Sequence, residues 1–107
     1  MKREPPIRVL VIDDSAANRR EISAVLESAP GITVVDRASD GDEGLQKAVA
    51  LKPDVVTLDL EMPRLDGFTF LRLLKATART PVIVLSSYAH PSDVFKALQL
   101  GAFDFVA

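Results

Sequence analysis

The sequence RVLVIDD occupies residues 8–14 and carries the clearest structural signal in this chain of 107 residues. Four apolar residues follow one another from Val9 to Ile12, and three of them are β-branched. Such a run is typical of a strand that is buried on both faces of a parallel sheet, so we expect a strand over residues 8–13. Two aspartates, Asp13 and Asp14, stand where that strand ends.

Similar runs recur along the chain and alternate with segments of helical periodicity. Further strands are expected over residues 32–35, 54–58, 81–85 and 103–106. Between them, apolar residues recur three and four positions apart, as they do on one face of a helix. These positions are Ile22, Val25, Leu26 and Ala29, then Leu45, Ala48 and Val49, then Phe70, Leu71 and Leu74, and finally Val94, Ala97 and Leu98.

Residues that begin or end helices stand at the boundaries of these segments. They are Pro30-Gly31, the capping-box variant formed by Asp40 and Glu43, Lys52-Pro53, Asp66-Gly67, Pro91 and Gly101. The alternation predicts an α/β fold, a doubly wound parallel sheet with right-handed crossovers. We count five strands but four helices, because the chain stops in or just after the fifth strand. The last helix of such a fold is therefore expected to be missing from this chain.

Composition narrows the classes of function. Hydrophobic residues make up 48% and charged residues 26% of the chain, as in an ordinary globular domain, and the length fits one domain. The net charge is −2, so the chain lacks the positive excess of proteins that bind nucleic acid directly. There is no cysteine and one histidine, which leaves oxygen ligands for any metal. No apolar run could span a membrane and residues 1–6 resemble no signal peptide, so we expect a cytoplasmic protein.

Acidic and hydroxyl side chains follow three of the expected strands. Asp13 and Asp14 end the first, Asp59 the third, and Ser86 and Ser87 the fourth. In open parallel sheets, ligands bind beyond the carboxyl ends of the strands. If the first and third strands are neighbours, the carboxylates share one pocket, and Mg²⁺ is a natural counterion for them.

These residues could also perform phosphoryl chemistry. A carboxylate beside a divalent metal can attack phosphorus and give an aspartyl phosphate. Asp59 is the candidate nucleophile, and Asp13 and Asp14 are the candidate metal holders. A single aspartate at a strand end is more often a turn or cap residue, so the interpretation depends on all three acids meeting at one edge.

Four segments together resemble the receiver domain of two-component response regulators. They are VLVIDDS at 9–15, DVVTLDLEMPRLDGFTFL at 54–71, PVIVLSS at 81–87 and GAFDFVA at 101–107. The resemblance implies a flavodoxin-like sheet of strand order 2-1-3-4-5. It divides the chain into an N-terminal extension, residues 1–6, and a receiver domain, residues 7–107, truncated after the fifth strand.

The resemblance also implies a role for each site residue. Asp59 accepts a phosphoryl group from a histidine kinase, and Asp14 binds Mg²⁺ directly. Asp13 acts on the metal through water, and the backbone carbonyl of Glu61 is a further ligand. Ser86 matches the switch hydroxyl of the family, and Phe105 matches the aromatic residue that moves with it.

Within that family, VVTLDLEMP, VIVLSS and GAFDFVA most resemble the regulatory domain of the chemotaxis protein-glutamate methylesterases. The implied output is a methylesterase domain in the same protein, or a partner protein. The chain has no G-x-S-x-G motif, so we expect no esterase activity from it alone. Receivers place a lysine directly after the fifth-strand segment, whereas this chain ends at Ala107, which leaves its competence for phosphorylation open.

Three other classes of protein share parts of this pattern. An aspartate-nucleophile phosphatase of the dehalogenase type places two aspartates one residue apart after its first strand, whereas Asp13 and Asp14 are adjacent. A nucleotide or flavin module would need a glycine-rich phosphate loop, which the sequence lacks. A degenerate receiver would act only as a binding module. Arg19 and Arg20 are expected on a solvated helix face, or at a surface where a kinase docks.

Overall fold

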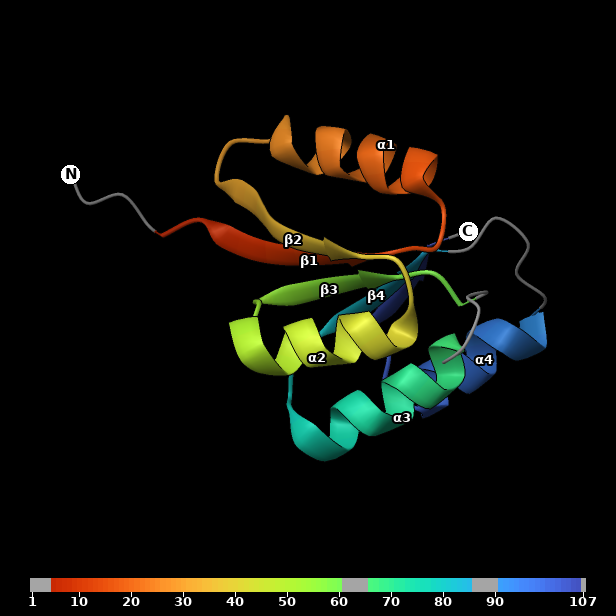
Figure 1. Cartoon of the computed structure of the whole chain (residues 1–107). Helices are drawn as coiled ribbons and strands as arrows, with labels where there is room; N and C mark the ends of the chain where they lie inside the picture. The colour runs from red at the N-terminus through yellow and green to blue at the C-terminus, as the bar shows by residue number, and fades with distance from the viewer. Residues whose placement is uncertain (1–4, 61–65, 86–90, 107) are drawn as a thin grey trace.

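The computed structural model describes residues 5–60, 66–85 and 91–106 (Figure 1). Its elements are β1 (Ile7–Ile12), α1 (Ala16–Glu27), β2 (Ile32–Ala38), α2 (Gly41–Leu51), β3 (Val55–Leu58), α3 (Gly67–Thr77), β4 (Val82–Leu85), α4 (Pro91–Gln99) and β5 (Asp104–Val106). Among these residues, no helix has the length and apolar character needed to cross a membrane.

The strands form one parallel sheet of five strands in the order β2-β1-β3-β4-β5. This confirms the predicted doubly wound α/β fold and its strand order. The chain reverses its winding direction between β1 and β3, which lie side by side with Ile12 opposite Leu58. Both strands therefore end at the same level of the sheet.

One face of the sheet holds most of the core. Figure 1 shows α2, α3 and α4 together on this face, and α1 on the other. Leu10, Ile12, Val56, Leu58, Val82 and Val84 project from the strands into a cluster with Phe70, Leu71 and Leu74 of α3. The helix α2 approaches β1 so closely that a Cβ atom at Gly44 would lie 2.5 Å from Cδ1 of Ile12. The strands that carry the site are therefore closely packed against α2 and α3 on this face.

The opposite face leaves an apolar groove beside α1. Ile22, Val25 and Leu26 of α1 line it with Thr57, Ile83 and Leu85 of the sheet, and its volume is about 710 Å³. Val25, one of the apolar residues at helical spacing in α1, is 70% exposed on the wall of this groove. The hydroxyl of Thr57 is buried in this region and has no hydrogen-bond partner among the described residues. We name this feature the α1 groove.

Strand β2 is longer than its apolar run predicted. It continues to Ala38, and its register with β1 shifts after the pair Val9 and Val34, so that Leu10 lies opposite Asp36. Charged side chains support the added residues. The ammonium group of Lys47 lies 3.3 Å from the Asp36 carboxylate, and Nε of Arg37 donates to the buried Ser23 hydroxyl at 2.8 Å. The extension brings the Ala38 carbonyl within reach of Asp13, whose amide donates to it at 3.1 Å.

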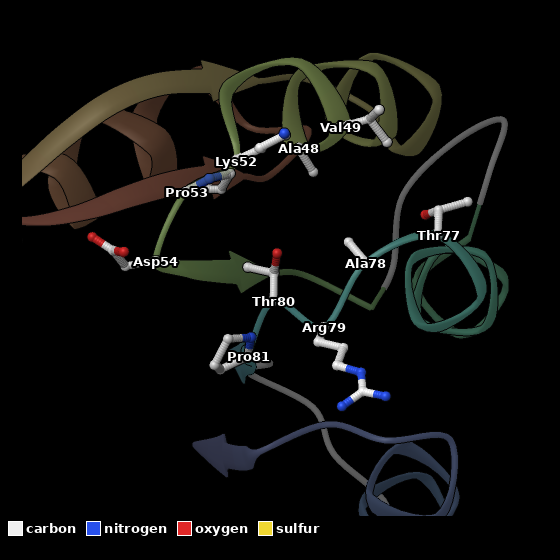
Figure 2. Close-up of a pocket in the computed structure, with 10 residues that line it drawn as sticks. All are labelled: Ala48, Val49, Lys52, Pro53, Asp54, Thr77, Ala78, Arg79, Thr80 and Pro81. Atoms are coloured by element: carbon white, nitrogen blue, oxygen red, sulfur yellow. The ribbon is translucent and has the colours of Figure 1, made fainter.

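A second hollow, of about 420 Å³, lies at the far end of the sheet from the strand-end acids. Figure 2 shows its lining residues on the last turn of α2, the end of α3, and the connections into β3 and β4. Two of its polar groups are already engaged. The Asp54 carboxylate accepts from the amide of Arg8 at 2.8 Å, and the Thr77 hydroxyl donates to the carbonyl of Leu73 at 3.0 Å. We assign this hollow no chemistry.

The helix caps match the sequence expectations at α2 and α3. Asp40 accepts from the amide of Glu43 at 2.8 Å, and the Glu43 carboxylate reaches back to the amide of Ser39. At α3, the Asp66 carboxylate accepts from the amide of Thr69 at 3.0 Å and from its hydroxyl at 3.1 Å. The bond from the Thr69 amide is the main cause that lowers the pKa of Asp66 below its ordinary value of 3.8.

We expect Asp66→Ala to lower the free energy of unfolding by about 1 kcal/mol at neutral pH, because the amide of Thr69 loses its acceptor. Asp66→Asn keeps an acceptor for this amide but removes the negative charge, so it measures the effect of the charge separately. Since folding lowers this pKa, the stabilising effect of the charge is full above the unfolded value of 3.8 and disappears as pH falls through the folded pKa. Urea unfolding of the three proteins across this range measures it. A difference between Asp and Asn that did not change with pH would contradict the prediction.

Candidate functional site

Three carboxylates meet at the carboxyl ends of β1 and β3. One oxygen from each of Asp13, Asp14 and Asp59 lies within 4.8 Å of the others. The pairing of the two strands causes this, because the amide of Asp59 donates to the Ile12 carbonyl at 3.1 Å and continues the ladder by one residue. The prediction that the three acids share one pocket is confirmed.

Asp13 is the buried member of this cluster, with 5% of its surface exposed. Its carboxylate accepts from the amide of Ser15 at 2.9 Å, and its backbone carbonyl accepts from Nη1 of Arg19 at 2.7 Å. Burial is the largest influence on the carboxyl group and raises its pKa above 3.8. The negative charge of Asp14 adds to this rise, whereas the Ser15 amide and the charge of Arg19 oppose it.

The other two acids are more accessible than Asp13. Asp14 is exposed and Asp59 is half-buried, so the cluster opens toward solvent on the side of these two residues. Carboxylates this close repel one another unless a proton or a cation intervenes. An all-oxygen donor set with an open side fits a hard divalent cation such as Mg²⁺, which keeps several of its own waters when it binds.

The backbone after Asp59 is packed against the start of α3. The amide of Gly67 donates to the Leu60 carbonyl at 3.0 Å. A Cβ atom at position 67 would lie 2.6 Å from the Leu60 Cα atom and 3.1 Å from the Asp59 carbonyl oxygen. Asp66-Gly67 was interpreted from sequence only as the start of a helix. The structure adds that the glycine allows α3 to approach the strand end that carries Asp59.

The remaining predicted site residues are only partly described. Glu61, Ser86 and Ser87 lie outside the described residues, so their predicted roles stay predictions. The backbone of Phe105 belongs to β5 and pairs with Val84, but its side chain lies outside the description. Sequence reasoning did not identify Arg19 as a contact of the site. An arginine one helical turn after Ser15, the N-cap of α1, was the available signal.

In doubly wound sheets, ligands bind at the point where the winding reverses, and this sheet carries three carboxylates there. The sequence model of the response regulator receiver domain matches residues 9–107, and this chain belongs to that family. Membership argues against a dehalogenase-type phosphatase.

Comparison with curated relatives shows which members of the receiver family this chain resembles most. The chain is 71% identical over 107 residues to protein-glutamate methylesterase/protein-glutamine glutaminase 1 of Myxococcus xanthus, and 59% identical over 105 residues to enzyme 6 of that name from Anaeromyxobacter dehalogenans. The two matches include 100% and 98% of this chain, but only 31% and 30% of the length of the relatives. The chain therefore spans about a third of the length of the curated relatives it matches. Within the receiver family it is most like the regulatory domain of these methylesterases.

Solved structures agree with this assignment. The response regulator domain of Thermotoga maritima CheB superposes with a TM-score of 0.92 at 44% identity, over 95% of this chain and 78% of that chain. A complex of Borrelia burgdorferi CheX and CheY with BeF3 and Mg²⁺ also matches, with a TM-score of 0.88 and 31% identity over 96% of this chain and 78% of that one.

Proposed function

We propose that this chain is the phosphoacceptor domain of a chemotaxis response regulator, and that Asp59 is the residue phosphorylated by a histidine kinase. The observation that carries the proposal is the meeting of Asp13, Asp14 and Asp59 at one edge of the sheet. In the reaction, a carboxylate oxygen of Asp59 forms a bond to phosphorus while the bond between phosphorus and the kinase histidine nitrogen breaks. The products are an acyl phosphate on the domain and a free histidine on the kinase.

Each acid has a separate role in this proposal. Asp14, which is exposed, binds Mg²⁺ directly together with Asp59, and the buried Asp13 acts on it through water. The backbone carbonyl of Glu61 would complete the protein ligands. When bound, the metal neutralises charge on the transferred phosphoryl group. The match to a receiver complex that contains BeF3 and Mg²⁺ supports this assignment.

The proposed output follows from the relatives. We propose that residues 1–6 are an N-terminal extension and residues 7–107 the receiver domain, and that phosphorylation controls a methylesterase domain in the same protein or a partner protein. Ser86 would turn its hydroxyl toward the phosphoryl group and Phe105 would move with it, as a population shift between two states. The names of the Myxococcus and Anaeromyxobacter relatives support this output, and a cytoplasmic location is part of the proposal.

We expect Asp14→Ala to weaken Mg²⁺ binding by about tenfold or more, which corresponds to about 1.4 kcal/mol, and to slow phosphorylation without unfolding the domain. The reason is the loss of one of the two direct carboxylate ligands. Titration calorimetry with MgCl₂ measures the affinity. Asp42→Ala, which removes an acid from the first turn of α2, serves as the matched control. Unchanged Mg²⁺ affinity in Asp14→Ala would refute the metal assignment.

A further inference from the structure

The side chain of Arg19 turns toward the acid cluster rather than into solvent. It is partly buried, and its Nη1 atom donates to the backbone carbonyl of Asp13 at 2.7 Å. The neighbouring Arg20 is exposed, whereas Arg19 is only partly exposed on the same helix. Within the part of the chain that the structure describes, no hydrogen bond or ion pair is found for Arg20.

The hydrogen bond from Arg19 is one of three that Asp13 makes, and together they hold the turn between β1 and α1. The amide of Asp13 donates to the Ala38 carbonyl at 3.1 Å, and its carboxylate accepts from the amide of Ser15 at 2.9 Å. The guanidinium group of Arg19 fixes the remaining polar group of the residue, the Asp13 carbonyl. Asp13 is therefore tied to β2, to the start of α1 and to the side of α1.

This arrangement bears on Asp14 through the geometry of the peptide bond. The Asp13 carbonyl and the Asp14 amide belong to the same planar unit, so a donor that fixes the carbonyl also fixes the plane from which Asp14 projects. Asp14 is exposed, and one of its carboxylate oxygens lies within 4.8 Å of an oxygen of Asp13 and of Asp59. A hydrogen bond from a charged donor is among the stronger restraints available to a backbone carbonyl.

We propose that Arg19 is a positioning residue for the metal site, which orders the Asp13–Asp14 peptide so that the Asp14 carboxylate is held ready for Mg²⁺. The role of the metal rests on the function proposed above, whereas the ordering of the turn does not. Arg19 touches neither phosphorus nor metal in this proposal, and acts only through the backbone.

A purely electrostatic role for Arg19 makes the opposite prediction. A positive charge near the cluster opposes the binding of a second cation, so removing it would tighten Mg²⁺ binding. A positioning role means that removal leaves the turn disordered, and Mg²⁺ must then order it on binding, which weakens the affinity. The sign of the change in affinity therefore separates the two roles.

The test compares Arg19→Gln and Arg19→Lys with the control Arg20→Gln, which removes the same charge from the next residue. In metal-free protein, amide order parameters from NMR relaxation should fall at residues 13–15 in Arg19→Gln and remain unchanged in α2 and α3. Mg²⁺ affinity by calorimetry should fall by about fivefold, equivalent to about 1 kcal/mol. Arg19→Lys keeps the charge but loses the planar fork, so its affinity should lie between those of Arg19→Gln and the native protein. Arg20→Gln should leave both quantities unchanged.

Unchanged order at residues 13–15, or Mg²⁺ affinity in Arg19→Gln equal to or tighter than in the native protein, would overturn the proposal for Arg19. The proposed function fails in a distinguishable way, because the native protein itself would then bind no Mg²⁺ at millimolar concentration. The order parameters of the metal-free turn still decide whether Arg19 positions the Asp13–Asp14 peptide in that case.

Discussion

Asp59→Asn should abolish phosphorylation by a small phosphodonor in the presence of Mg²⁺, because an amide oxygen is too weak a nucleophile to form the acyl phosphate. Mass spectrometry of the intact chain and of its peptides measures the adduct and its position. Asp54→Asn is a matched control directly before the start of β3. Its side chain stands at the opposite end of β3 and would still accept from the amide of Arg8. This variant should be phosphorylated as the native chain is.

An adduct that persists on the chain in Asp59→Asn would show that another group is the acceptor. Asp13 and Asp14 would be the first alternatives, because their oxygens lie within 4.8 Å of the same cluster. Peptide mapping distinguishes these outcomes. The intact acids argue against a degenerate binding module, and complete failure of the native chain to react would favour that module over a phosphoacceptor.

The second large effect concerns the α1 groove. The 107-residue chain alone should self-associate in sedimentation experiments. The reason is that Ile22, Leu26 and Ile83 line an apolar surface that is accessible to solvent. Val25→Lys, at a position that is 70% exposed on the groove wall, should weaken association by about tenfold. Val49→Lys is the matched control, since Val49 is 49% exposed on α2, on the other face of the sheet. A monomeric native chain, or equal effects of both substitutions, would contradict this prediction.

The same groove indicates what a longer protein would need to provide. A further amphipathic helix laid beside α1 would cover the apolar wall, and a polar group on it could satisfy the buried hydroxyl of Thr57. We expect an extended protein that begins this segment with a lysine to be monomeric, to melt at a higher temperature and to be phosphorylated faster. The lysine would pair with phosphoryl oxygens, as the resemblance to receivers implies.

Sequence patterns predicted the parts of the fold that depend on local chemistry. Continuous β-branched runs located the buried strands, and Asp40 and Asp66 located two helix starts, because strand burial and capping leave direct marks in composition. The strand order came from the family resemblance. The meeting of Asp13 and Asp59 depended on that order, since residues 46 positions apart become neighbours only through the pairing of β1 and β3.

What the sequence did not reveal depends on tertiary contacts. The apolar spacing of α1 shows that Val25 could face a core, but not whether an element covers it. β2 continues through Asp36 and Arg37 because Lys47 and Ser23 lie close by, which no strand pattern records. Arg19 looks like any surface arginine until the turn brings the Asp13 carbonyl to it, at 2.7 Å.

The charged continuation of β2 also bears on how the sheet meets other chains. Open strand edges invite pairing with further strands, which leads to domain swapping or fibrils. At this edge, Nη2 of Arg37 lies 3.6 Å from the Glu27 carboxylate, and the ammonium group of Lys47 donates to the Arg37 carbonyl. The register shift after Val34 makes the strand irregular. An incoming strand would have to displace these groups. These groups make the β2 edge a poor template for a further strand.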